Sequence, residues 1–166
     1  PGWRGPEGRP VADGAPLPAR WSRSRHVAWS VPIPGERSSS PIVCGDNIFV
    51  TSALDAGRRR ILHCLDRRTG ATRWTAVTKD ADPERTSAIT GHAAATPVTD
   101  GERVVALFGN AGVVAVDFSG TRLWSRPLGE FDSELGLASS PVLHDGLVYI
   151  VCDHDGDRSK SFDSYL

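Results

Sequence analysis

The sequence predicts an all-β fold built from four-stranded antiparallel units, and three observations carry that prediction. The 166 residues include 17 glycines and 12 prolines, a density of turn-forming residues that helical bundles rarely carry. From Val27 onward the chain alternates short runs rich in Val and Ile with clusters of Gly, Asp, Asn, Ser and Pro, which is the pattern of strands and turns. The third observation is that this pattern repeats along the chain.

The first 26 residues do not share the pattern. Residues 1–26 are rich in Pro, Gly and Arg and show no periodicity, so they are expected to form an irregular N-terminal arm. Trp3 and Trp21 are its expected anchors, because a large aromatic side chain is costly to leave in water. Residues 27–31, Val-Ala-Trp-Ser-Val, then read as a single outer strand with no unit before it.

The first part of the repeat is a proline followed by a turn and a β-branched run. It occurs three times, over Ser39–Val50, Ala95–Ala106 and Ser139–Ile150. In each copy a small polar residue precedes the proline, an apolar residue follows it, and an Asp/Gly turn leads into the second strand.

The second part of the repeat is a strand that ends at Asp, followed by a glycine turn and a tryptophan. Its two copies are His63–Trp74 and Val114–Trp124. Asp bonds readily to the backbone two residues on, and Gly supplies the positive φ that closes a tight turn, so a strand should return after each glycine. The tryptophan then falls at the same place on each returning strand.

Together the two parts make four antiparallel strands per repeat, and four-stranded units at a period of about 40–55 residues are β-propeller blades. Residues 27–166 are therefore expected to form a partial propeller: the orphan outer strand 27–31, a blade over 39–77, a blade over 95–126 and half a blade over 139–166. The expected strands are Ile42–Cys44, Ile48–Ser52, Arg60–Asp66, Thr72–Val77, Val98–Thr99, Val104–Phe108, Gly112–Phe118 and Arg122–Arg126. A ring typically needs four or more blades to close, so this would be a fragment of one.

Composition excludes several classes of function. The 19 basic and 20 acidic residues give a net charge of −1, so there is no basic field to hold nucleic acid. No apolar stretch is long enough to be a transmembrane segment. The chain opens on Pro1 and contains no Met, so its first residue is not a translation start and the absence of a leader carries no information.

Candidate chemical sites are few. Asp153–Asp157 alternates oxygen ligands as a calcium loop does, but its glycine is fourth and its twelfth position is Ser164, so a charged hairpin loop is the preferred interpretation. Four histidines, His63, His92, His144 and His154, lack metal-site spacing, and three cysteines, Cys44, Cys64 and Cys152, form no CxxC pair. We therefore assign no catalytic, cofactor-binding or metal-ligating residue.

Two surface segments remain. The run Arg58–Arg60 is expected to be a solvated hairpin turn, or alternatively a rim contact for an acidic partner. The loop Lys79–Gly91 between the two full blades is long and polar, and long propeller connections often carry binding surface. It is the first segment to test for function.

The segment Leu-Asp-x-x-Thr-Gly-x-x-x-Trp at 65–74 resembles the repeat of the pyrroloquinoline-quinone (PQQ) β-propeller family, and Val116–Trp124 is a slightly shorter variant. The opening Trp3–Pro6, with Leu17–Trp21 and Val27–Gly35, resembles the start of bacterial, planctomycete-type PQQ-like repeat proteins. The resemblance covers about residues 3 to 166 and implies a PQQ-like, WD40-like propeller.

The same resemblance is compatible with three functions, one of which is a sensor or accessory domain of a larger cell-envelope protein. The preferred one is a non-catalytic scaffold that binds a protein, or a small ligand, on a propeller face, in the periplasm or cell envelope. The alternative is part of a PQQ-dependent quinoprotein dehydrogenase, with PQQ and calcium as cofactors. Many such enzymes carry a stacking Trp and several have adjacent cysteines, which are absent here; Trp74 and Trp124 are expected to pack between blades instead.

Overall fold

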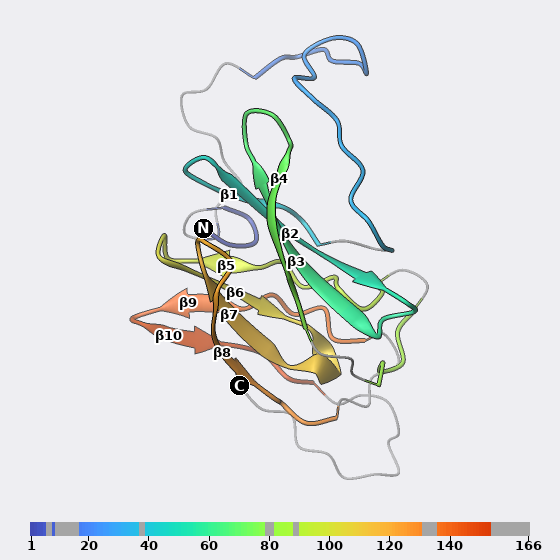
Figure 1. Ribbon diagram of the computed structural model, residues 1–166, viewed down its shortest axis with the longest axis vertical. Helices are drawn as coiled ribbons and strands as arrows, with labels where there is room; N and C mark the ends of the chain where they lie inside the picture. Colours follow the sequence, from blue (N-terminus) through green and yellow to red (C-terminus); the bar gives the residue numbers. More distant parts are fainter. Residues whose placement is uncertain are drawn as a thin grey trace.

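The computed structural model describes residues 1–5, 8, 17–36, 39–78, 82–87, 90–130 and 136–153. Its first sheet has the order β1-β2-β3-β4 and is antiparallel throughout (Figure 1). The four strands are β1 Ile42–Cys44, β2 Asn47–Leu54, β3 Arg59–Asp66 and β4 Thr72–Val77. Each strand pairs with the next along the chain, as the repeat predicts.

A second four-stranded sheet repeats this order as β5-β6-β7-β8. Its strands are β5 Val98–Thr99, β6 Arg103–Leu107, β7 Val113–Asp117 and β8 Arg122–Arg126, with the 3-10 turn η2 Gly109–Ala111 between β6 and β7. The hairpin of β9 Val142–His144 and β10 Leu147–Tyr149 follows beside it. The prediction of an all-β propeller fragment is confirmed, and strand limits differ from those expected by only about two residues.

The two sheets share an irregularity that marks them as copies. The register shifts between Cys64 and Leu65 in the first sheet and between Ala115 and Val116 in the second, two residues before the Asp of each turn. Cys64 pairs with Trp74 and Ala115 with Trp124. The bulge therefore places both tryptophans at the same register position.

Two apolar clusters lie between successive sheets and form the core. The first joins β2 and β3 to alternate residues of β6 and β7, among them Phe49, Leu62, Val104 and Val116. The second uses the other face of β6 and β7, through Val105 and neighbours, and reaches the β9–β10 hairpin. Because successive residues of a strand point to opposite faces, the second sheet is buried on both sides, which explains its unbroken apolar runs.

The N-terminal region departs from one expectation and leaves another untested. The expectation that Trp3 and Trp21 anchor this region by burial is wrong, because these residues are 56% and 73% exposed. Residues 27–31 form no strand with any described residue, so the outer strand proposed there stays a prediction. The described part of residues 1–26 carries no strand beyond an isolated bridge between Ser22 and Arg25.

Candidate functional site

The two glycine turns lie at the same end of their sheets, and each is held by its own aspartate. The Asp66 carboxylate accepts hydrogen bonds from the Arg68 and Thr69 amides, both at 2.9 Å, and from the Thr69 hydroxyl at 3.0 Å. The Arg73 guanidinium at 2.5 Å, together with these donors, holds the pKa of Asp66 well below its usual range. Asp117 organises the second turn in the same way, through the Ser119 and Thr121 amides at 2.9 Å.

Each turn receives a tryptophan from the preceding segment of the chain. The Trp74 indole N–H donates to the Phe118 carbonyl at 2.9 Å, and the Trp29 indole N–H donates to the Arg67 carbonyl at 3.0 Å. Both acceptors directly follow the turn aspartate. Trp29 therefore occupies in the N-terminal segment the position that Trp74 occupies in the first sheet.

The turn glycines are required by contact as well as by conformation. Gly70 and Gly120 have φ of 75° and 88°, a region that side chains disfavour. A Cβ at Gly70 would lie 2.6 Å from the Trp29 ring, and one at Gly120 would lie 2.7 Å from the Trp74 ring. Trp29 and Trp74 thus pack between neighbouring units, as the sequence predicts for Trp74. Trp124, for which the sequence makes the same prediction, packs against the second apolar cluster.

At the opposite end of the sheets, a buried ion pair joins the two blades. The side chains of Arg60 and Glu84 are 0% and 3% exposed, and their closest N–O distance is 2.9 Å. Arg60 also donates to the carbonyls of Gly57 and Phe108, and the Glu84 carboxylate accepts from the Asn110 amide at 3.3 Å. The expected solvated turn over Arg58–Arg60 is therefore wrong at Arg60, which lies on the same face of β3 as Leu62 and Cys64.

The ion pair anchors residues 82–87 of the polar loop that follows the first sheet. Within the described residues 82–87, Glu84 is buried, and its carbonyl lies 3.1 Å from the His92 imidazole. Around this anchor the surface is charged: Arg58 lies 3.5 Å from Asp82, with side chains 60% and 99% exposed, and Arg59 lies 2.6 Å from Asp55. We call Asp55, Arg58, Arg59, Asp82 and Arg85 the charged rim.

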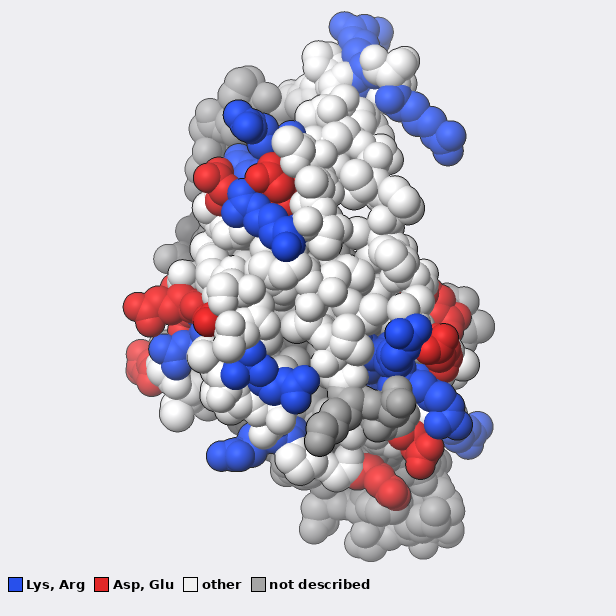
Figure 2. Space-filling model, in the orientation of Figure 1, with Lys and Arg blue, Asp and Glu red and all other residues white. Residues whose placement is uncertain are grey.

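The charges visible on one face of the molecule are of mixed sign. Figure 2 shows Lys and Arg interspersed with Asp and Glu around a broad uncharged area. This agrees with the near-zero net charge. Recognition by this chain would therefore depend on local complementarity at a surface such as the charged rim rather than on a single-sign field.

The remaining candidate residues are dispersed. His63 is buried against Ser52 at 2.8 Å, and burial lowers its pKa, whereas His144 is 71% exposed. Cys64 and Cys152 are buried, and burial raises the pKa of Cys64 to about 11. The candidate calcium loop lies outside the described residues after Asp153, as does His154.

The described residues lack both a metal-binding cluster and a membrane-spanning helix. They contain no group of three or more His, Cys, Asp or Glu side chains placed to hold a metal ion. They also contain no helix long and apolar enough to cross a membrane.

Comparison with known proteins gave one family and a structural likeness. The model of the family described as outer membrane protein assembly factor BamB matches residues 19–160. The crystal structure of BamB from Moraxella catarrhalis is 18% identical, with a TM-score of 0.49; the alignment covers 74% of this chain and 33% of that one. The chain thus spans about a third of that protein's length. A search of curated proteins found no match.

The family match runs from before Trp29 to beyond β10, so it contains both complete sheets and both described tryptophan contacts. These are the segments in which the PQQ-like repeat was recognised, and the structure gives them the four-stranded antiparallel order of propeller blades. The chain therefore belongs to the BamB-like family of PQQ-repeat β-propellers.

Proposed function

We propose that this chain is part of a non-catalytic scaffold that binds a protein partner in the cell envelope. The family name supports the proposal, since BamB is described as an assembly factor for outer membrane proteins. A propeller suits this role because its blades hold surface loops on a rigid frame. The contact surface we assign is the charged rim.

The observation that carries the assignment is the burial of Arg60 and Glu84 beneath the charged rim. A polar loop would ordinarily be free to move, and a partner would have to order it on binding. Here the Glu84 carboxylate holds the described loop residues 82–87 against Arg60 of β3 and the Asn110 amide, while Arg58 and Asp82 stay exposed. A preformed charged surface favours specific recognition of a protein surface with complementary charges.

Site-specific photocrosslinking in cells tests the proposal. A photoreactive residue placed at Asp82 in the full protein should give a crosslink to a discrete protein of the envelope, identified by mass spectrometry. The matched control position is Arg68, an exposed residue in the glycine turn at the opposite end of the sheets. Reversing the rim charges with Arg58→Glu and Arg59→Glu should remove the crosslink from Asp82.

Crosslinks at Arg68 equal to those at Asp82, or crosslinks that survive charge reversal, would contradict the rim assignment.

The dehydrogenase alternative is tested separately by titrating the full protein with PQQ and calcium while following the quinone absorbance. Packing of Trp74 supports the scaffold, because its N–H and one ring face are already occupied by Phe118 and Gly120. Saturable binding of PQQ would reverse our preference.

A further inference from the structure

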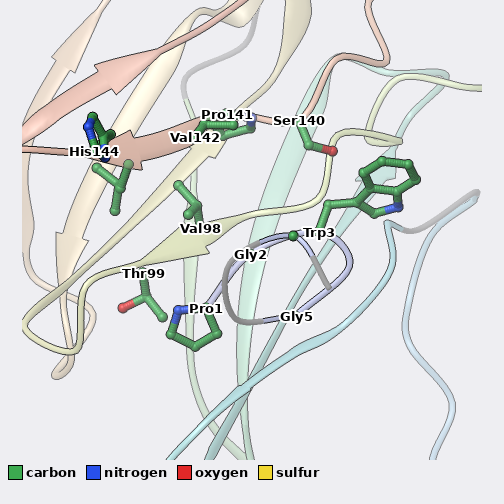
Figure 3. Close-up of a pocket in the computed structure, with 12 residues that line it drawn as sticks. Pro1, Gly2, Trp3, Gly5, Val98, Thr99, Ser140, Pro141, Val142 and His144 are labelled. Carbon is green, nitrogen blue, oxygen red and sulfur yellow. The ribbon is translucent and has the colours of Figure 1, made fainter. Parts of the chain in front are cut away.

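The first residues of the chain lie against the innermost strands of the propeller fragment. The Thr99 amide of β5 donates to the Pro1 carbonyl at 2.9 Å. In Figure 3, Pro1 lies beside Thr99 and Gly2 lies close to Val98, while the Trp3 ring lies on the side of Ser140. Residues 1–5 therefore reach the inner strand of the second sheet and the start of the third.

This contact uses a strand edge. In the sheet order, β5 is a terminal strand that pairs with β6 on one side only, with Thr99 opposite Val104. The bond to Pro1 satisfies an amide that a terminal strand would otherwise offer to solvent or to another chain. The segment makes this bond through Pro1 and then turns, since the Gly5 N–H donates to the Gly2 carbonyl at 3.0 Å and Arg4 has a φ of 65°.

The fit is close at the second residue. A Cβ built on Gly2 would lie 3.0 Å from the Val98 Cγ2 atom, so a larger residue here would have to displace either the segment or Val98. The third residue contributes differently: Trp3 is 56% exposed, and the Arg4 guanidinium lies 5.3 Å from its ring centroid. The backbone and the small second residue hold the segment, rather than a buried aromatic ring.

The segment leaves space on both sides. One cavity of about 460 Å³ lies between it and the inner residues of the second and third units, including Val98, Pro141 and Leu143. A second cavity of about 450 Å³ lies between it and the first unit, including Pro41 and Val43. Residues of β1, β5 and β9 therefore border the two cavities that residues 1–5 also line.

We propose that the inner edges of β1, β5 and β9 form a binding site for a short, glycine-containing peptide that turns at its second to fifth residues, and that residues 1–5 occupy it in cis. The recognised features are a backbone carbonyl for the Thr99 amide and a glycine against Val98. This site is separate from the charged rim, so it does not depend on the proposed scaffold function. Residues 1–5 would have to leave before another peptide could bind at β5.

Amide hydrogen exchange of Thr99 tests the occupancy. Removing residues 1–5 from the full protein should raise the Thr99 exchange rate at least ten-fold, while amides of β6 and β7 keep their protection. Gly2→Val should act in the same direction, because the added side chain collides with Val98. Arg4→Asn is the matched control: Asn tolerates the positive φ of 65° at that position, and only the contact with Trp3 is lost.

A peptide corresponding to residues 1–8 tests whether the edge is a binding site. Added to the protein that lacks residues 1–5, it should restore slow exchange at Thr99, whereas the same peptide with Gly2→Val should not. The intact protein should bind the peptide at least ten-fold more weakly. Unchanged Thr99 exchange after the deletion, with β6 and β7 still protected, would overturn the proposal, and so would a peptide that fails to restore protection at millimolar concentration.

Discussion

Removing the Glu84 carboxylate should destabilise the protein more than any other single change in its loop. In Glu84→Ala, the guanidinium of Arg60 stays buried without its counter-ion, and the Asn110 amide loses its acceptor. Breaking one partner of a buried ion pair costs about 3–5 kcal/mol, because the remaining charge is uncompensated. Desolvation is complete on the arginine side, where the side chain is 0% exposed, so the cost should fall within that range.

Urea unfolding of the full protein is the assay. With an m value of about 2 kcal/mol/M, a loss of about 3–5 kcal/mol lowers the midpoint by about 1.5–2.5 M. Asp82→Ala is the control from the same loop: its carboxylate is 99% exposed and lies 3.5 Å from Arg58, so its removal should change stability by less than about 1 kcal/mol. The conservative Glu84→Gln should fall between the two, since the amide oxygen can still accept a hydrogen bond.

A double-mutant cycle then isolates the pair. Arg60→Met combined with Glu84→Met should cost less than the sum of the single changes, because no charge is left buried alone. Equal midpoints for Glu84→Ala and Asp82→Ala would refute the reasoning, since the Arg60–Glu84 pair could not then be a buried link between the sheets. Strict additivity in the cycle would refute the coupling of the two side chains.

Three further predictions follow from particular contacts. Gly120→Ala should lower the melting temperature more than Gly101→Ala, because both glycines have positive φ but only Gly120 lies against the Trp74 ring; equal losses would mean that the ring is not in contact. Burial lowers the pKa of His63, so below its ordinary value of 6.5 the unfolded state binds more protons than the folded state, and stability should fall as the pH falls through that value. His63→Gln should reduce this dependence in urea titrations at pH 8 and 5.5, and an unchanged dependence would refute the assignment to His63. Cys64, with a pKa of about 11, should resist iodoacetamide at pH 8 in the folded protein and react after denaturation, as peptide mass mapping would show.

The strands and their turns could be predicted because their signals are local. Asp66 and Gly70 define one turn and Asp117 and Gly120 the other, and a strand must return after each. The burial of Arg60 was missed because a run of three arginines suggests a solvated turn. Alternation from Cys64 through Leu62 would have placed Arg60 on the face between blades, but its buried partner Glu84 is 24 residues away in a polar loop.

The contact of residues 1–5 had no local signal. Nothing in Pro-Gly-Trp-Arg-Gly specifies a partner. The expectation that the Trp3 ring anchors the arm by burial was wrong, because the contact is made by the Pro1 backbone carbonyl and Trp3 is 56% exposed. The hydrogen bond from Thr99 joins residues that are distant in sequence and depends on a free strand edge. Such an edge exists only after the sheet has formed, so propensity and periodicity could not reveal it.

The paired tryptophan contacts have a consequence for how this kind of chain can lengthen or shorten by gene duplication. Trp29 binds the turn of the first sheet and Trp74 that of the second, so each indole belongs in sequence to one unit and in contact to the next. A segment cut at the sheet boundaries would separate an indole from its carbonyl. A segment from Thr72 to Thr121 instead carries an outer strand, the three inner strands of the following sheet and the intact contact between Trp74 and Phe118. The segment that keeps this contact intact is therefore offset from the four-stranded sheet by one strand.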